Sequence, residues 1–280
     1  MMRHRTAIAA LVAAGALGGC ALDEPEGDGR NQQVEYRTGT NENPNVDDPI
    51  DYTSNGERGN VSVTEVLWSG SVEGTMEARV HHPDDIFIEL QNKHPRPVHL
   101  TGWLLTVRTG ANLDTYEPYV SHGDRAHVTY VLPARENGQP IEPNGYVIIA
   151  ARRDGAFRDA DYYIEDLRLP EGPFEISLQD LDERLMDHAL DYRKPIFAGG
   201  FDLVTSRSME RTQLIFGNRG NRDSSWHAYS LNAWDAAGED SLHVSLRRRI
   251  HEDFRALTYA TPGRPNSPDY SGNVSSGSFE

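Results

Sequence analysis

Cysteine is nearly absent from this sequence, which contains a single one, Cys20, in 280 residues. One cysteine cannot form a disulfide within the chain, so we expect none in the mature protein. Long apolar runs are missing as well. The run Thr6–Ala16 near the N-terminus is too short to span a bilayer as a stable anchor.

Basic residues are in deficit. The chain has 27 Lys and Arg against 43 Asp and Glu, for a net charge of −16 at pH 7. Residues 1–20 carry +2, residues 21–60 carry −7 and residues 267–280 carry −2, which leaves −9 for residues 61–266. A surface of this sign repels the phosphates that dominate nucleic-acid affinity. We therefore expect no nucleic acid among the partners of this protein.

Motifs of the common catalytic sites are also missing. The sequence has no Gly-x-Ser-x-Gly elbow, no glycine-rich phosphate loop before a helix and no His-Glu-x-x-His pair. His81 and His82 precede Asp84 and Asp85, but adjacent residues of a strand point to opposite faces and cannot easily share one metal ion. We expect no metal site, no cofactor and no enzymatic activity.

What is present begins with a leader. Arg3 and Arg5 precede the apolar run, as in a secretory signal, and Leu17-Gly18-Gly19-Cys20 resembles a bacterial lipobox. The resemblance implies that Cys20 is lipidated, palmitate included, and becomes the N-terminus of an envelope lipoprotein. Each buried methylene contributes about 0.8 kcal/mol, so two or three acyl chains anchor firmly. Ala21 favours the outer membrane by resemblance to enteric sorting signals. An incidental cysteine beside an ordinary cleavage site is the alternative.

Residues 21–60 have a different composition. They contain ten acidic residues and three arginines, few aliphatic residues, and many Gly, Asn and Pro. Such a segment cannot bury enough apolar surface to offset its ordering entropy, so we expect a disordered acidic linker. Its ends would lie on the order of 35 Å apart. Residues 267–280 are expected to form a flexible tail.

Residues 61–266 show repeated alternation of apolar and polar residues, bounded by Gly, Pro, Asn or Asp. This pattern predicts one all-β domain, a β-sandwich with one face of each sheet buried and the other solvated. The expected strands are Val61–Trp68, Ile86–Leu90, Val98–Val107, Ala126–Leu132, Tyr146–Ala150, Phe174–Leu181 and Ser225–Leu231.

One segment breaks this period. Between Asp240 and Leu257, apolar residues recur at steps of three and four, which predicts a single C-terminal amphipathic helix. Its polar face would carry Arg247, Arg248 and Arg249, either as a solvated surface or as a site for an anionic partner.

Several segments resemble, in order, the lamin tail domain, an immunoglobulin-like β-sandwich. The pattern includes a Thr-Glu-Val strand at Glu65, an apolar-Glu-Leu strand at Glu89 and a Leu-x-Gly-Trp strand ending at Trp103. It continues with a Ser-apolar-Glu-Arg segment, "SMER", and closes with Thr-Pro-Gly-x-x-Asn, "TPGRPN". The resemblance covers nearly all of residues 61–266 and implies an immunoglobulin-like fold.

The expected core follows from these strands. Trp103 shares its face with Leu105 and Val107, so the indole should fill the space between two sheets. Glu89 should point to the opposite face, toward solvent or toward backbone N–H groups of a loop. The residues assigned to the structural core are Val66, Leu90, Leu100, Gly102, Trp103 and Trp226.

Four insertions distinguish this chain from the family pattern, at Gly110–Asp124, Arg152–Pro170, Asp191–Phe201 and Trp234–Leu257. Loops positioned by a rigid scaffold carry function more often than the scaffold does. The sequence therefore favours a membrane-anchored, non-catalytic binding or scaffold module for an envelope protein or glycan. Two alternatives stay open: an accessory domain to a separate secreted enzyme, and a divergent hydrolase. The hydrolase would use carboxylates from the pairs Glu165 and Asp166, or Asp180 and Asp182.

Overall fold

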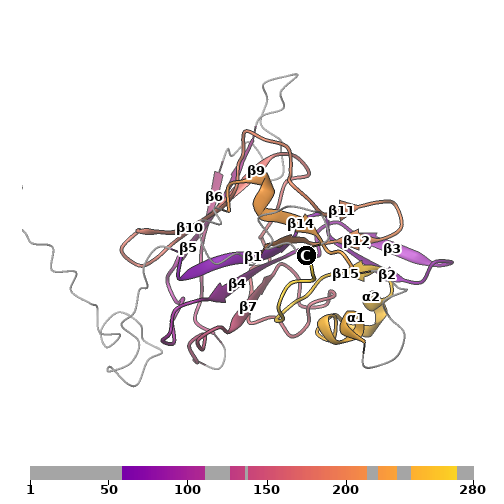
Figure 1. Cartoon of the computed structure of the whole chain (residues 1–280), viewed down its shortest axis with the longest axis horizontal. Helices are drawn as coiled ribbons and strands as arrows, with labels where there is room; N and C mark the ends of the chain where they lie inside the picture. The colour runs from indigo at the N-terminus through magenta and orange to yellow at the C-terminus, as the bar shows by residue number, and fades with distance from the viewer. Residues whose placement is uncertain (1–58, 111–126, 136–137, 213–219, 232–240, 270–280) are drawn as a thin grey trace, which may run out of the picture. The chain divides into compact units, whose positions relative to one another are not determined.

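The computed structural model describes residues 59–110, 127–135, 138–212, 220–231 and 241–269 (Figure 1). The leader with Cys20, the linker up to residue 58 and most of the first insertion lie outside the described residues. Within the described ranges the chain is built mainly of β-strands, with few and short helices, so the predicted all-β class is confirmed. Those ranges contain no helix that is long and apolar enough to cross a membrane.

The larger sheet has six strands, in the order β14-β13-β1-β4-β7-β8. All neighbours pair antiparallel except β7 and β8, which pair parallel. The strands are β1 (Val61–Leu67), β4 (Phe87–Asn92), β7 (Tyr146–Ala150), β8 (Tyr162–Tyr163), β13 (Met209–Arg211) and β14 (Trp226–Ala228).

A second, antiparallel sheet has four strands in the order β10-β9-β5-β6: β5 (Leu104–Thr109), β6 (His127–Val131), β9 (Phe174–Gln179) and β10 (Leu185–Leu190). Two small sheets complete the described strands. One is the hairpin of β2 (Ser71–Gly74) and β3 (Arg79–His82), and the other joins β11 (Gly200–Phe201), β12 (Ser206–Arg207) and β15 (Thr258–Tyr259). A 3₁₀ turn, η1 (Asp223–Ser225), precedes β14.

The two large sheets contribute to one hydrophobic cluster. Val66 of β1 and Leu90 of β4 belong to it, together with Leu105 and Ile176 of the second sheet. Alternation continues along β5, where Leu105 and Val107 are buried and Arg108 is exposed. The remaining predicted core side chains lie in the same cluster: Leu100, Trp103 and Trp226.

Gly102 lies in the turn before β5, with a φ of +81°. A Cβ atom built there would lie 2.5 Å from Cδ2 of Leu181. The left-handed backbone and the close side chain together explain why glycine precedes the tryptophan.

The expectation of one solvated face is wrong for β1, because all seven of its residues are buried. A register shift between Val63 and Glu65 turns Val63 and Val66 both toward the main cluster. The opposite face is covered by a second cluster. It contains Leu67, Phe87 and Ala150 of three adjacent strands, packed with Phe157, Ile250, Phe254 and Ala260 from later segments.

The same outer face carries three buried glutamates side by side. Glu65 of β1 is the direct cross-strand partner of Glu89 on β4 and of Glu210 on β13, and all three are fully buried. We call this set the glutamate row. Burial raises the pKa of Glu65 to about 7 and raises the pKa of Glu89 and Glu210 well above the usual value. Repulsion from Glu65 raises the pKa of the other two further.

The C-terminal segment 261–267 satisfies the glutamate row. The backbone N–H groups of Thr261, Gly263 and Ser267 donate to Glu65, Glu89 and Glu210 at 2.7, 2.6 and 2.9 Å. The Thr261 hydroxyl lies 3.0 Å from Glu65 and 3.2 Å from Glu210, so its single proton can go to either carboxylate. Glu89 therefore bonds the backbone N–H of a loop, the second of the two orientations expected for it. Ser267, assigned to the flexible tail, is buried and bonded to Glu210.

The expectation of a single C-terminal helix is wrong. Two short helices, α1 (Leu242–Leu246) and α2 (Glu252–Arg255), replace it. Ser241 caps α1, and the extended backbone of His251, with φ −56° and ψ 144°, starts α2. The break lets Arg247 turn inward, where its guanidinium donates to the Thr258 carbonyl oxygen at 2.9 Å and lies over the Tyr259 ring. A continuous helix would give up these buried contacts.

Candidate functional site

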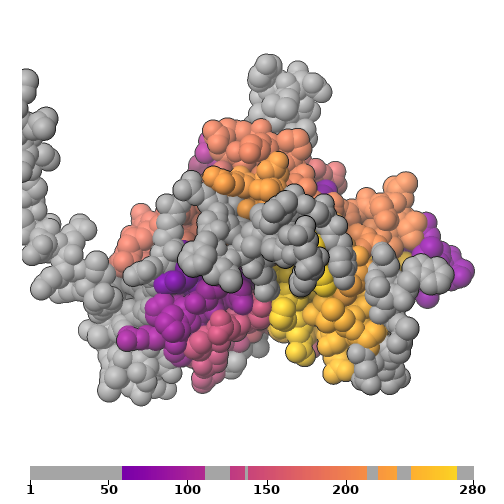
Figure 2. Space-filling view, viewed as in Figure 1, coloured from indigo at the N-terminus to yellow at the C-terminus, as the bar shows by residue number. Residues whose placement is uncertain are grey.

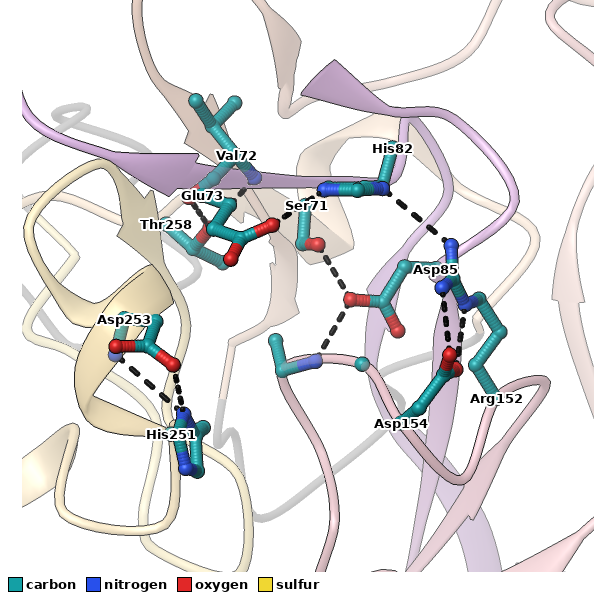
Figure 3. A network of polar contacts seen from close by, with 12 residues as sticks. Ser71, Val72, Glu73, His82, Asp85, Arg152, Asp154, His251, Asp253 and Thr258 are labelled. Carbon is teal, nitrogen blue, oxygen red and sulfur yellow. Dashed lines mark hydrogen bonds and ion pairs between the residues drawn. The ribbon is translucent and has the colours of Figure 1, made fainter. Parts of the chain in front are cut away.

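Two insertions that are far apart in the sequence meet beside the hairpin β2–β3. The His251 N–H donates to the Ala156 carbonyl oxygen at 2.8 Å, which joins the insertion 152–170 to the described part of the insertion 234–257. Val72 of β2 donates its N–H to the Thr258 hydroxyl at 2.8 Å, and that hydroxyl donates back to the Val72 carbonyl oxygen at 3.1 Å (Figure 3). The two insertions thus form one surface, supported by β2 and β15.

Asp85 anchors the start of the first of these insertions. Its buried carboxylate accepts hydrogen bonds from the Ala156 N–H at 2.7 Å and from the Ser71 hydroxyl (Figure 3). A Cβ atom at Gly155 would lie 2.0 Å from Oδ1 of Asp85, so only glycine allows the loop to approach this closely. Burial raises the pKa of Asp85, against the lowering effect of its two donors.

A chain of polar contacts runs along the edge of the hairpin. The Nε2 atom of His82 lies 2.9 Å from the Glu73 carboxylate, and its Nδ1 atom lies 3.4 Å from the Arg152 guanidinium (Figure 3). Because arginine can only donate, Nδ1 must accept and Nε2 must carry the proton. Arg152 in turn bonds Asp154 at 3.0 and 3.1 Å. The His82 ring is thereby held between the Glu73 carboxylate and the Arg152 guanidinium.

Two hollows open on this surface. The first, of about 270 Å³, is lined by charges of both signs: Arg152, Arg153, Arg168, Asp84, Asp154 and Glu165. We call it the mixed hollow. The second, of about 370 Å³, is lined by Arg158, Asp159, Arg248, Arg249, Ile250, His251, Glu252 and Arg255. We call the second the arginine hollow. All eight lining residues belong to the two insertions. Figure 2 shows the C-terminal segment from residue 241, in gold to yellow, as part of the molecular surface.

Backbone carbonyl groups hold three of the four guanidinium groups in the arginine hollow, those of Arg158, Arg249 and Arg255. Arg255 donates to the carbonyl oxygens of Ile250 at 2.8 Å and Arg248 at 3.0 Å. Arg249 donates to the carbonyl oxygen of Asp159, and Arg158 donates to that of Gly155 at 3.2 Å. Carbonyl groups fix the position of an arginine without neutralising its charge. Among the described residues, two carboxylates approach these arginines at the limit of an ion pair: Asp253 lies 4.0 Å from Arg158, and Asp161 lies 3.8 Å from Arg249.

The carboxylates proposed for a hydrolase do not form a shared centre. Glu165 lies in the mixed hollow, 3.8 Å from the Arg153 guanidinium. Asp180 and Asp182 lie in the turn between β9 and β10, where both face Arg184, at 2.7 and 3.7 Å. Asp166 is exposed, and its carbonyl oxygen accepts from the Tyr130 hydroxyl at 3.1 Å.

Four histidines of the hairpin and of the C-terminal insertion also have separate partners. His81 bonds the Ser69 carbonyl oxygen at 2.7 Å and stacks on Phe201, whereas His82 faces Glu73. His243 is buried against Tyr229, and His251 lies between Arg158 and Asp253. Within the residues that the structure describes, no group of three His, Cys, Asp or Glu is placed to hold a metal ion.

Comparison with protein-family models finds no match for the sequence, and comparison with curated proteins finds none. The site therefore has to be interpreted from its own geometry. The sequence predicted a basic polar face at Arg247, Arg248 and Arg249, and it indicated both insertions separately. The prediction is wrong for Arg247, which is buried. The sequence gave no indication that Arg158 and Arg255 would join Arg248 and Arg249, because nothing local connects residues 158 and 248.

Proposed function

We propose that this protein is a lipid-anchored envelope protein whose lamin-tail-like, immunoglobulin-like domain is a non-catalytic binding module. The binding surface is the face where the insertions 152–170 and 234–257 meet. The observation that carries the proposal is the arginine hollow, because four arginines that line one depression suit recognition of an anionic partner.

The family part of the proposal is supported by where the resembling segments lie. The glutamates of three segments, Glu65, Glu89 and Glu210, stand in one row across adjacent strands. The closing Thr-Pro-Gly-x-x-Asn segment bonds that row through Thr261 and Gly263. The segments that resemble this family are therefore in direct contact, through strand pairing and hydrogen bonds. The two sheets that share one core are compatible with a sandwich.

A divergent hydrolase, or an accessory domain to a separate enzyme, is the alternative. The mixed hollow favours the hydrolase, because Glu165, Asp84 and Asp154 line one depression of about 270 Å³. The close contacts of Asp84 and Asp154 with Arg152 weigh against it, since these carboxylates are already engaged.

Binding can be tested with the full-length chain, immobilised and incubated with solubilised envelope fractions. We expect a component that is retained by the wild-type protein and lost with Arg158→Gln combined with Arg248→Gln. The matched control is Arg96→Gln, an exposed arginine outside both insertions. No retained component, or equal retention by all three proteins, would contradict the proposal.

The anchor is tested separately. Cells that express the protein are labelled with palmitate, and we expect label in the wild-type chain and none in Cys20→Ser. The lipid is attached to the thiol, which serine lacks, so the substitution removes the acceptor. Label that persists in Cys20→Ser would show that the lipobox assignment is wrong, whatever the domain binds.

A further inference from the structure

The arginine hollow has the properties of an anion site. Four arginines line it together with two carboxylates, Asp159 and Glu252. Among the described residues neither carboxylate forms an ion pair with those arginines, and Arg248 and Arg255 have no carboxylate partner. The one carboxylate near Arg158 is that of Asp253, at 4.0 Å, and the one near Arg249 is that of Asp161, at 3.8 Å, among the described residues.

The positive charge is exceptional in this protein. The chain as a whole carries −16, so arginines placed at random on its surface would find acidic neighbours. Here the nearest acids are occupied elsewhere: Asp161 also pairs with Arg135, and Asp253 lies 3.2 Å from His251. Grouping four guanidinium groups costs free energy through mutual repulsion, and an anion between them would offset that cost.

Two of the donors, Arg249 and Arg255, are held in place before any ligand arrives. Arg255 uses Nε and one terminal nitrogen, Nη2, for backbone carbonyl oxygens, and its other terminal nitrogen remains for a ligand. Arg249 is confined on its other side by Gly263, where an added Cβ atom would lie 2.4 Å from Nη1 of the arginine. Ordering in advance lowers the entropy lost on binding. Planar guanidinium groups with several N–H donors match the oxygens of a phosphate group.

We propose that the arginine hollow binds a phosphate group, with Arg158, Arg248, Arg249 and Arg255 as its ligands. The inference rests on the proposed binding module and gives it a ligand class. A phosphate monoester or free phosphate and the phosphodiester of a lipid headgroup offer the same oxygen chemistry, and the volume of about 370 Å³ admits a small phosphorylated group.

The test is calorimetric titration of the full-length chain, purified in detergent, with three probes: inorganic phosphate, glycerol 3-phosphate and glycerophosphoglycerol. We expect saturable binding of at least one probe. Arg248→Gln should weaken it about tenfold, or about 1.4 kcal/mol, because the substitution removes one positively charged hydrogen-bond donor. Preference for glycerophosphoglycerol would identify a lipid headgroup as the source, and preference for either of the other two a monoester or free phosphate.

Arg248 is the informative position because it is exposed and its side chain has no partner among the described residues, so its loss leaves the fold intact. Arg255→Gln should weaken binding as well, with melting temperature measured alongside, since Arg255 also bonds two carbonyl oxygens. Arg96→Gln should change affinity less than twofold. Absence of binding with all three probes, or binding that Arg248→Gln leaves unchanged, would overturn the inference. The wild-type protein could still retain an envelope component after such a result. The proposal of a binding module and the proposal of a phosphate ligand are therefore tested separately.

Discussion

Replacing Trp103 by alanine is expected to lower the free energy of unfolding by about 3–5 kcal/mol. The indole is fully buried in the cluster to which both large sheets contribute. Removing it leaves a cavity that rigid strands on either side cannot close. Its backbone is held as well, because the Trp103 carbonyl oxygen accepts from the Leu132 N–H at 2.8 Å. Urea denaturation followed by circular dichroism measures the loss.

Trp103→Phe is the matched control. The indole N–H has no hydrogen-bond partner among the described residues, so phenylalanine gives up no hydrogen bond and removes a buried polar group. We expect a cost below about 1.5 kcal/mol, as for other near-conservative exchanges in a core. A wild-type midpoint for Trp103→Ala, or equal losses for the two variants, would contradict the position of the ring.

The second large effect is a pH dependence that comes from the glutamate row. The pKa of Glu65 is about 7 in the folded protein, against 4.5 for an ordinary glutamate. Between these values the folded chain holds a proton that the unfolded chain has lost, so the contribution of Glu65 to stability decreases as pH rises. A shift of this size corresponds to about 3 kcal/mol. The raised pKa of Glu89 and Glu210 acts in the same direction.

Glu65→Gln isolates this effect. Glutamine can accept from the Thr261 N–H and donate to the Thr261 hydroxyl, so it replaces the protonated acid without titrating. We expect the variant to gain stability relative to wild type as pH rises from 5 to 8, by about 3 kcal/mol, measured by urea denaturation at each pH.

The comparison with wild type is needed because His99 and His227 titrate in the opposite sense. Burial lowers the pKa of His99 to about 4 and lowers the pKa of His227, so these residues destabilise the fold as pH falls below 6.5. Glu165→Gln, which replaces an exposed acid outside the glutamate row, is the matched control. A constant difference between Glu65→Gln and wild type across this range would contradict a raised pKa.

Strands were predictable where short apolar-rich segments lie between turn residues, although β1, β4 and β7 are buried on both faces and only β9 of these four alternates in burial. The segments around β1, β4, β7 and β9 carry their pattern in the sequence itself. The hairpin β2–β3 was missed because its outer strand, Arg79–His82, has no buried residue and therefore no alternation. The helix break was missed because the apolar spacing up to Leu257 is correct for a helix. The buried bonds of Arg247 to Thr258, which favour the break, are tertiary.

The sites were less predictable than the strands. A glutamate between apolar residues suggests a solvated face, and only the cross-strand register reveals that Glu65, Glu89 and Glu210 are neighbours. The arginine hollow joins residues about 90 positions apart, as the contact between Arg158 and His251 shows. Local periodicity carries no information about such contacts.

The closure of the glutamate row by residues 261–267 has a consequence for biosynthesis. The bond from Thr261 to Glu65 joins positions separated by 196 residues, and its donor is among the last parts of the domain that the ribosome produces. A nascent chain that lacks this segment leaves three acids without their donors, so burying them is unfavourable and the central strands stay open. Folding of the central strands is thereby coupled to synthesis of residues 261–267, and we expect a chain truncated before Thr261 to be open to proteolysis.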